Sequence, residues 1–537
     1  FFKQKTAYEI VSRDWSSDVC SSDLEKELEK VTQSITKLKS EKDKLQKKKL
    51  EGDLSKITKE IEKQKAKLDE VLKGLDRVDD LQAIDAEVKR LDDRRRELQH
   101  NNTILEDEAR DVERHLMNEV NNRKIKELAF NPALAHKFNE AAAQWLKEDE
   151  ADKLKAKVQA VNAVESYKFN EMEEVPGTRL VNYLYGMTKR YRAYDRNTIL
   201  NLYICLAQNL LTVFSGRPGC GKTSICHIMA HVLGTTSMEA RSATEGVNRF
   251  LPVAVERGWT SKRDFLGYFN PLTKHFETPD PRRYLAVQML DAENKANLNK
   301  FPYVVLLDEA NLSPMEYYWA DFMNAGLDVG SMNTLSLGDG TLYQIPPTLR
   351  FVATINNDQT TENLSPRLID RAWIITLPDA SWESLSQVEE VPPAGDECWQ
   401  IVDWQTLQDV FSYSSCAKEI EKYEEKIDAI LAAVYKSMSQ LGLNPSPRTQ
   451  KAILAYVAAG TRWFKKEADQ AFTFNTAIDY AVSQKLLPSI CLVGDKYESR
   501  LKALQNVLET NDLTRSARML QAMIDRGNAS MNLYSFF

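Results

Sequence analysis

The stretch LTVFSGRPGCGKTSICHIMAHVLG, Leu211 to Gly234, joins a short apolar run to a helical pattern through a glycine-rich loop. The loop itself, GRPGCGKT from Gly216 to Thr223, fits the pattern G-x-x-x-x-G-K-[ST]. Glycines let the backbone wrap a phosphate, because a Cβ would block the close approach, and N–H groups at the helix start then hold the negative charge. A chance glycine-rich turn is the alternative, but the strand–loop–helix context favours a nucleotide-binding loop.

Side chains of this loop have separate expected tasks. The ammonium of Lys222 can reach the terminal phosphates, and the hydroxyl of Thr223 can bind Mg²⁺. The loop contacts only phosphates and therefore does not distinguish ATP from GTP. The expected nucleotide-binding residues are Gly216, Pro218, Gly219, Cys220, Gly221, Lys222, Thr223 and Ser224.

A second apolar run, YVVLLDEAN from Tyr303 to Asn311, ends in two neighbouring carboxylates. A buried strand here would place Asp308 and Glu309 at the carboxyl edge of a parallel sheet, where such folds bind ligands. We expect Asp308 to hold Mg²⁺ and Glu309 to polarise the attacking water. An acidic helix N-cap is the alternative, and the preceding phosphate loop favours hydrolysis.

A third run, LRFVATINN, predicts a core strand beside the phosphate strand, with Asn356 near the γ-phosphate as a polar sensor. Arg371 follows too far along the chain to be assigned to its own nucleotide. An arginine supplied in trans stabilises the charge on the transferring phosphoryl group, so Arg371 predicts contact between subunits. Arg367 is the second candidate, and a surface salt bridge is the alternative for either. Arg448, in NPSPRTQKAI, begins a helix from which a lid domain could sense phosphate.

The order of these motifs resembles that of AAA+ ATPases. The run ATINNDQTTENLSPRLIDRA resembles the dynein-related and MoxR-like branch, and more specifically the McrB-like motors of prokaryotic restriction and phage-defence systems. The segments Gly258–Phe276 and Asp308–Leu327 support this resemblance, which covers about Val181 to Pro378 well and the C-terminal helices loosely. It implies a P-loop AAA+ core with a helical lid, a homo-oligomer (a hexamer in this family) and an McrC-like nuclease subunit as effector.

One departure from the McrB-like pattern concerns the base. McrB-like GTPases carry Met-Asn-x-x-Asp after the third core strand, whereas this chain has Ile355-Asn356-Asn357-Asp358-Gln359. In the McrB-like pattern, this Asn/Asp pair resembles the one that reads guanine in other GTPases. Because the acid stands one position early here, we expect ATP with Mg²⁺ as the nucleotide, and GTP is the alternative.

Composition divides the chain into five predicted parts. Residues 1–24 read as a translated sequencing adapter and are expected to be an artefact; residues 25–125 carry apolar residues at heptad spacing, which predicts a coiled coil. Residues 126–177 are expected to form a helical linker and residues 178–380 the nucleotide-binding α/β core. A Pro-containing acidic stretch then leads into a helical lid, residues 381–537.

The remaining composition sets limits on partners. A net charge of -7 over 537 residues gives no global signature of a nucleic-acid-binding protein. Seven cysteines without paired spacing, and no apolar run near the roughly 20 residues that span a bilayer, predict a cytoplasmic protein without a membrane partner. We see no nuclease motif, so DNA cutting would need a partner.

Two weaker motifs leave alternatives open. GWTSKRDFLGYFNP combines four aromatic residues with two cations: Trp259, Phe265, Tyr268 and Phe269 with Lys262 and Arg263. The segment could face a pore, a partner or DNA, or pack as core around the sheet edge. His227 and His231 stand four residues apart on a predicted helix and could share a metal, although packing is the simpler interpretation.

Two other functions compete with an McrB-like motor. A MoxR-like chaperone would remodel a protein complex instead of driving a nuclease. A structural ATPase would use its coiled coil as a scaffold, but it would need a second coil arm and a signature loop that we do not find.

Overall fold

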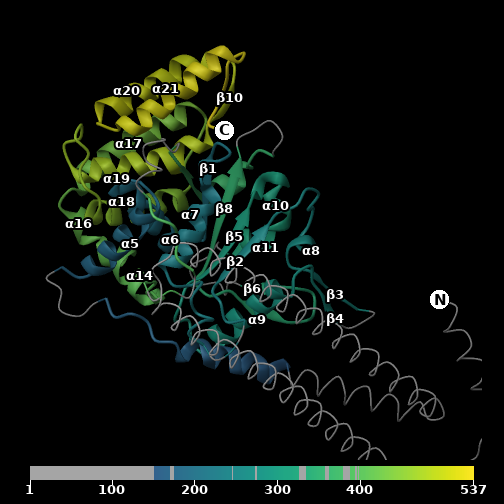
Figure 1. Cartoon of the computed structure of the whole chain (residues 1–537). Helices are drawn as coiled ribbons and strands as arrows, with labels where there is room; N and C mark the ends of the chain where they lie inside the picture. The colour runs from purple at the N-terminus through teal and green to yellow at the C-terminus, as the bar shows by residue number, and fades with distance from the viewer. Residues whose placement is uncertain are drawn as a thin grey trace, which may run out of the picture. The chain divides into compact units, whose positions relative to one another are not determined.

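The computed structural model describes residues 150–169, 175–242, 244, 246–271, 275–325, 334–356, 362–378, 388–393, 396 and 398–537. All of them belong to the second of two compact units, Lys147–Phe537 (Figure 1). The predicted adapter segment and coiled coil, and most of the predicted linker, lie outside the described residues. The boundaries between the five predicted parts stay predictions.

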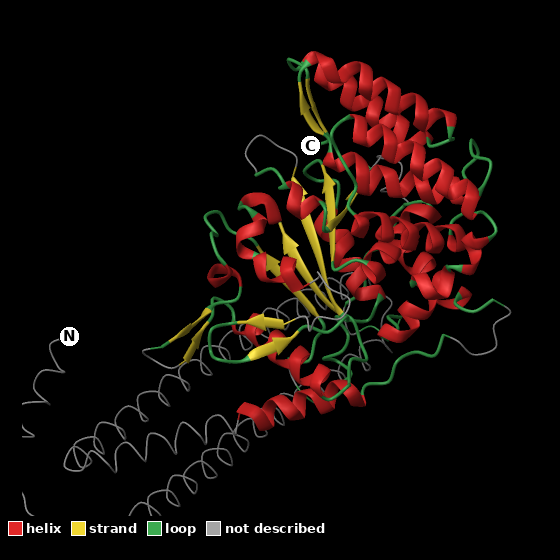
Figure 2. Ribbon diagram, turned by 180° about the vertical axis from the view of Figure 1, so that it is seen from behind, coloured by secondary structure: helices red, strands yellow, loops and turns green. Residues whose placement is uncertain are grey.

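A five-stranded sheet, parallel throughout, forms the centre of this unit, with helices on both faces (Figure 2). Its strand order is β2-β5-β8-β1-β9, and each pair of neighbouring strands is parallel. Strand β8 therefore lies between β1 and β5. Near-continuous burial of their side chains is typical of a sheet covered on both faces. This architecture confirms the predicted α/β core. The strands are β1 (Leu211–Gly216), β2 (Phe250–Ala254), β5 (Tyr303–Asp308), β8 (Leu349–Asn356) and β9 (Ala372–Thr376).

Helices precede β1, and further helices and two hairpins lie between the strands. Several begin with a side-chain cap: Asp195 accepts a hydrogen bond from the Thr198 N–H at the start of α6, and Asp280 accepts one from the Arg282 N–H at the start of α9. The helices are α5 (Thr178–Tyr191), α6 (Arg196–Gln208), α7 (Lys222–Val232), α8 (Lys262–Phe265), α9 (Pro281–Lys295), η1 (Ala310–Leu312), α10 (Met315–Tyr318), α11 (Ala320–Ala325) and α12 (Pro366–Ile369). The hairpins pair β3 (Tyr268–Asn270) with β4 (His275–Glu277), and β6 (Thr334–Ser336) with β7 (Leu342–Gln344).

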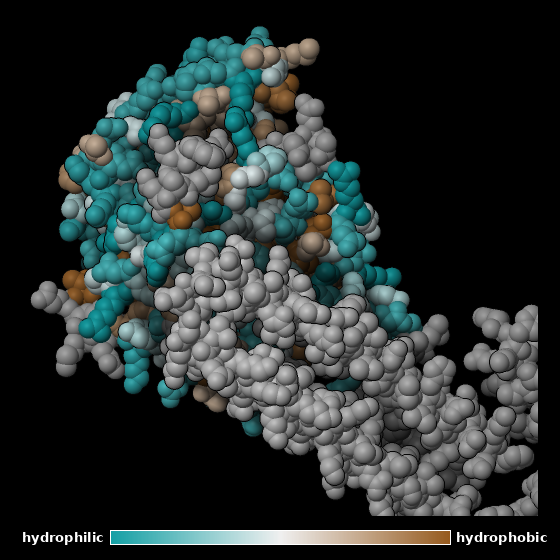
Figure 3. All heavy atoms as spheres, in the orientation of Figure 1, coloured by the Kyte–Doolittle hydropathy of each residue, from teal (hydrophilic) through white to brown (hydrophobic). Residues whose placement is uncertain are grey.

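The described C-terminal part is helical apart from one small antiparallel hairpin. Its role as a lid stays a prediction. Its visible outer surface is mainly hydrophilic (Figure 3). The helices are α14 (Trp404–Phe411), α15 (Tyr413–Cys416), α16 (Lys418–Glu421), α17 (Glu424–Gln440), α18 (Pro447–Trp463), α19 (Thr473–Ala481), the π-helix η2 (Val482–Leu486), η3 (Leu487–Ser489), η4 (Asp495–Tyr497), α20 (Glu498–Thr510) and α21 (Thr514–Ala529). The hairpin pairs β10 (Cys491–Val493) with β11 (Leu533–Ser535).

One hydrophobic core runs through both parts. It includes Val213 and Phe351 of the sheet as well as Ile453 and Leu504 of the C-terminal helices, all almost completely buried. Helix α18 lies against α6: the side-chain amide of Gln208 donates to the Ala455 carbonyl at 3.0 Å. The C-terminal helices are therefore packed on the α/β core without a separate core of their own.

Candidate functional site

The phosphate loop connects β1 to α7 at the carboxyl edge of the sheet. Gly219 and Gly221 have φ angles of 84° and 87°, a region that residues with a Cβ rarely adopt. Gly221 is also the N-cap of α7, and no side chain caps this helix. Backbone N–H groups of the first helical turn are left without intrahelical partners, and an anion is a natural ligand for them.

Lys222 lies inside the curve of this loop. Its ammonium donates hydrogen bonds to the carbonyls of Gly216 and Arg217, both at 2.9 Å, and the residue is buried. Arg217, Pro218 and Gly219 are exposed, so the outer face of the loop is open to solvent. The charge is thus held directly under the loop, where a bound phosphate would meet it.

A chain of hydrogen bonds joins the loop to the acidic strand. The Thr223 hydroxyl donates to Asp308 Oδ1 at 2.8 Å, and the Thr354 hydroxyl donates to the same oxygen at 2.6 Å. Thr354 also accepts a bond of 2.8 Å from the Glu309 N–H. A hydroxyl and a carboxylate, both hard oxygen donors, fit the small set of protein ligands that Mg²⁺ takes beside phosphates. Thr223 and Asp308, the expected metal ligands, are brought together here.

Glu309 occupies a constrained backbone position. Its φ and ψ angles of 53° and 44° lie in the left-handed region, which is uncommon for a residue other than glycine and is often found at functional sites. The residue is exposed, directly after the end of β5. The carboxylate is therefore reachable by solvent beside the phosphate loop.

Asn356 ends β8 opposite the first glycine of the loop, since Gly216 and Asn356 are register partners. Asn311 fixes its backbone: the Asn311 amide donates to the Asn356 carbonyl at 2.8 Å, and the Asn356 N–H donates to Asn311 Oδ1 at 3.2 Å. The structure therefore places Asn356 at the edge that holds Gly216 and Asp308, where a γ-phosphate sensor would have to be.

Sequence reasoning missed three residues of this site. Thr354 could have been noticed as a hydroxyl within an apolar strand, and Asn311 as the polar residue that follows the acidic pair. Arg192, just after α5, gives no sequence signal, yet its Nη2 lies 2.8 Å from the position that a Cβ of Gly221 would occupy. Its Nε is buried without a hydrogen-bond partner. A cation at the N-terminus of α7 is electrostatically unfavourable unless an anion joins it.

Arg371 lies at the opposite edge of the sheet. It precedes Ala372, whose register partner Leu211 begins β1, so roughly five residues, or about 17 Å, of extended strand separate it from Gly216. Its guanidinium donates to the carbonyls of Met323 and Arg367, both at 3.0 Å. The structure does not bring Arg371 to the phosphate loop of its own chain.

Arg448 is placed with Arg371 and away from that loop. It stands in the first turn of α18, after Ser446, which caps the helix and donates to Asp370 Oδ1 at 2.8 Å. Burial lowers the pKa of Arg371, and repulsion from Arg448 and Arg367 lowers it further. The first turn of α18 is therefore beside Asp370. That Arg448 senses phosphate stays a prediction.

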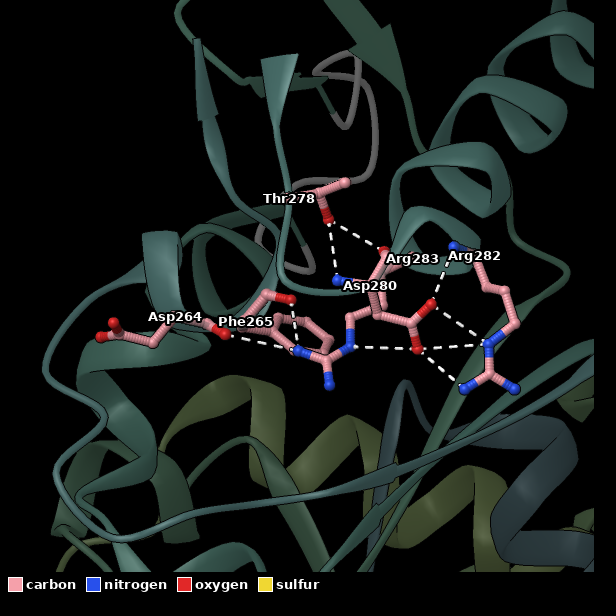
Figure 4. Close-up of polar contacts among 6 residues, drawn as sticks. All are labelled: Asp264, Phe265, Thr278, Asp280, Arg282 and Arg283. Atoms are coloured by element: carbon pink, nitrogen blue, oxygen red, sulfur yellow. Dashed lines mark hydrogen bonds and ion pairs between the residues drawn. The ribbon is translucent and has the colours of Figure 1, made fainter. Parts of the chain in front are cut away.

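The aromatic segment divides between core and surface. Trp259 and Phe265 are buried, and Arg283 lies over both rings at 5.3 and 5.9 Å. Arg283 also donates to the Phe265 carbonyl at 2.9 Å (Figure 4). The same view shows the Asp280 carboxylate accepting a hydrogen bond from Arg282. Tyr268 alone of these aromatic residues is exposed, so core packing accounts for Trp259 and Phe265.

The two histidines of α7 are engaged in packing. His227 meets the ring of Phe250 edge-on, and His231 stacks on Trp399 with a ring separation of 5.3 Å. Burial lowers the pKa of both. Among the described residues no group of three or more His, Cys, Asp or Glu side chains is arranged to hold a metal.

Comparisons with known proteins give one family model and one solved structure to report. The family model “Domain of unknown function (DUF8727)” matches residues 400–532, the region of the C-terminal helices. No match is found among curated proteins. A crystal structure of a “putative ATPase” from Cytophaga hutchinsonii is similar with a TM-score of 0.41 and 16% identity, over 68% of this chain and 97% of that chain. A likeness of this degree assigns no activity. No helix in the described part of the chain has the length and apolar character to cross a membrane.

Proposed function

We propose that this chain is a nucleoside triphosphatase that hydrolyses ATP with Mg²⁺. The observation that carries the proposal is the continuous chain of hydrogen bonds from Thr223 through Asp308 and Thr354 to the backbone of Glu309, next to the phosphate loop. A loop of this kind binds phosphate, and an adjacent pair of carboxylates supplies what hydrolysis needs in addition: a metal ligand and a base.

Each residue has a chemical task in this proposal. Thr223 and Asp308 would hold Mg²⁺, which supplies charge neutralisation on the phosphates. Glu309 accepts a proton from the attacking water. The water oxygen bonds to the γ-phosphorus, and the bond between the γ-phosphorus and the oxygen that bridges it to the β-phosphate breaks. Lys222 and Arg192 offset the phosphate charge, and Asn356 orients the water or the γ-phosphate.

We further propose that Arg371 and Arg448 act on the nucleotide of a neighbouring copy. Both arginines stand at the edge of the sheet away from their own phosphate loop, and Asp370 connects their two segments. Their use in catalysis would require a second subunit, which supports a homo-oligomer, with a hexamer as the expectation from the AAA+ resemblance. Such an arginine is worth about 10³–10⁵ in turnover.

We also propose an effector for this nucleoside triphosphatase. The sequence resemblance to McrB-like motors favours a separate nuclease subunit as the driven partner, with DNA reached through that partner or a pore. A neighbouring nuclease gene would favour this role. A neighbouring gene for a metal-chelatase or von Willebrand-type adaptor would instead favour a MoxR-like chaperone.

Glu309→Gln tests the nucleotide and the assembly together. The substitution should keep the bound nucleotide intact, because it removes the base and leaves the loop and metal ligands in place. We expect mass photometry to show a ring-sized particle with ATP and monomers without nucleotide. Assembly with GTP alone would overturn the ATP assignment, and no change with either nucleotide would contradict the motor itself. Lys222→Ala, which cannot neutralise the phosphates, is the matched control.

A mixing experiment tests action in trans. Lys222→Ala subunits lack nucleotide binding but keep Arg371, whereas Arg371→Ala subunits bind nucleotide but cannot serve a neighbour. We expect each variant alone to be nearly inactive and an equimolar mixture to recover ATPase activity at the mixed interfaces. A mixture no more active than its parents would contradict the trans assignment.

A further inference from the structure

The π-helix η2 (Val482–Leu486) contacts the chain on both sides of Arg371. The ammonium of Lys485 donates to the carbonyls of Ile369, Asp370 and Ala372 at 3.3, 2.8 and 2.7 Å. Lys485 is buried, and its three donors meet three acceptors. Backbone on either side of Arg371 is therefore fixed by one side chain from the C-terminal helices.

The side chain of Asp370 makes a second connection, to the start of α18. Its Oδ1 accepts from the Ser446 hydroxyl at 2.8 Å and from the Thr449 hydroxyl at 2.9 Å. Although partial burial raises it, these two bonds and the charges of Lys485 and Arg448 hold the pKa of Asp370 below its usual value. Asp370 is thus an anion that links the segment of Arg371 to the helix turn that carries Arg448.

A third contact fixes η2 to the edge strand. The indole N–H of Trp373, the second residue of β9, donates to Gln484 Oε1 at 2.6 Å, and both residues are buried. Two neighbouring side chains of η2 therefore contact this part of the chain: Gln484 contacts β9, and Lys485 contacts the residues around its start. Single π-turns inside α-helices are uncommon and are often found at functional sites.

We infer that Lys485 and Asp370 are positioning residues, which hold Arg371 and Arg448 as one rigid pair for presentation to a neighbouring subunit. The inference rests on the trans role proposed above and assigns to the C-terminal helices the task of setting the geometry of the arginines. Neither residue would touch the nucleotide. The physical reason is that Arg371 is repelled by three other cations, Arg367, Arg448 and Lys485. The Asp370 carboxylate offsets this repulsion and so keeps the two arginines close.

The mixing experiment distinguishes a misplaced Arg371 from a general loss of folding in the variant. Lys485→Met removes the charge while keeping an unbranched side chain of similar length. Such subunits should bind ATP normally, with KM within about twofold of the wild type, and lose at least about tenfold in kcat, because small displacements of catalytic groups have large effects on rate. Mixed with Lys222→Ala subunits, they should recover activity, since the partner supplies a correctly held Arg371. Mixed with Arg371→Ala subunits, they should not.

Two further variants keep the test decisive if Lys485→Met folds poorly. Thr449→Val removes the hydroxyl donor to Asp370 at nearly constant volume, and Asp370→Asn removes the anion. Like Lys485→Met, both variants should recover activity with Lys222→Ala subunits and not with Arg371→Ala subunits. Lys502→Met, at an exposed lysine paired with Glu498 on α20, is the control and should behave as wild type.

Recovery with neither partner, or wild-type kcat in Lys485→Met, would overturn the positioning role. If Lys222→Ala and Arg371→Ala also fail to complement each other, the trans proposal itself has failed, and the positioning inference fails with it. If those two do complement, a defect of Lys485→Met in nucleotide binding would refute the positioning inference alone.

Discussion

Single residues at the phosphate loop explain why this edge of the sheet suits an anion. Gly221 combines a left-handed φ with the close approach of the Arg192 guanidinium, so a side chain at this position would meet both obstacles. Lys222 and Arg192 bring two cations to the N-terminus of α7, where the helix dipole is also positive. The site gathers positive charge that a triphosphate would neutralise.

Arg192→Gln tests the residue that sequence reasoning missed. A hydrogen bond to a charged group contributes about 1.5–3 kcal/mol, so we expect KM for ATP to rise by roughly tenfold or more. The change in kcat should be smaller, because Arg192 would offset the phosphate charge and takes no part in the proton transfer to Glu309. Steady-state ATPase assays at saturating Mg²⁺ measure both constants. Lys189→Gln, a change at an exposed residue in the last turn of α5, is the control. An equal effect of the two variants would remove Arg192 from the site.

At the scale of elements, the end of α7 shows why some loops admit only glycine. Gly234 follows the helix with a φ of 71°, and a Cβ there would lie 2.7 Å from the Gln400 carbonyl oxygen and 2.7 Å from Ile401 Cα. Both neighbours are backbone, which cannot move aside as a side chain can. The stretch before α14 is therefore packed directly on the end of the phosphate-loop helix.

Gly234→Ala should destabilise the chain more than Gly442→Ala. Gly442 has a similar φ of 81° with nothing within 4 Å of a Cβ, so alanine there meets only backbone strain of about 1–2 kcal/mol. At Gly234 the clash adds roughly 1–3 kcal/mol. Thermal unfolding midpoints of the two variants measure the difference, and equal midpoints would show that the backbone around Ile401 can yield.

Much of the α/β core could be predicted because local patterns determined it. The apolar runs before Gly216, Asp308 and Asn356 each became a strand, and their polar ends met at one edge, since parallel strands share a carboxyl edge. The position of Arg448 could not be predicted in the same way. It depends on how α18 packs against α6, a contact between residues about 250 positions apart that no local pattern reports.

At the scale of the whole molecule, a buried lysine joins the C-terminal helices to the sheet. Burial lowers the pKa of Lys485 to about 8, attraction to Asp370 offsets this in part, and repulsion from Arg448 and Arg371 adds to it. The folded chain thus releases this proton near pH 8, while the unfolded chain keeps it to about pH 10.4. Between those values the unfolded state binds more protons, so this group makes stability rise with pH.

We therefore expect opposite trends for stability and activity in alkaline solution. From pH 7.5 to 9.5 the unfolding midpoint of the wild type should rise relative to that of Lys485→Met. Wild-type kcat should fall over the same range, because a neutral amine has two N–H donors for three carbonyls. Differential scanning fluorimetry and ATPase assays across pH measure the two trends. A relative midpoint that stays level over this range would mean that Lys485 stays charged in the folded chain.

The shared hydrophobic core of sheet and C-terminal helices has a consequence for how force would pass through an assembly. A part that swings during each turnover would have to separate buried surfaces such as those of Ile453 and Leu504 and expose them to water. Within Lys147–Phe537, the sheet and the C-terminal helices are better suited to move together as one block. Conformational change during turnover would then occur at the interfaces between copies of the chain, as a change in the relative orientation of neighbouring subunits.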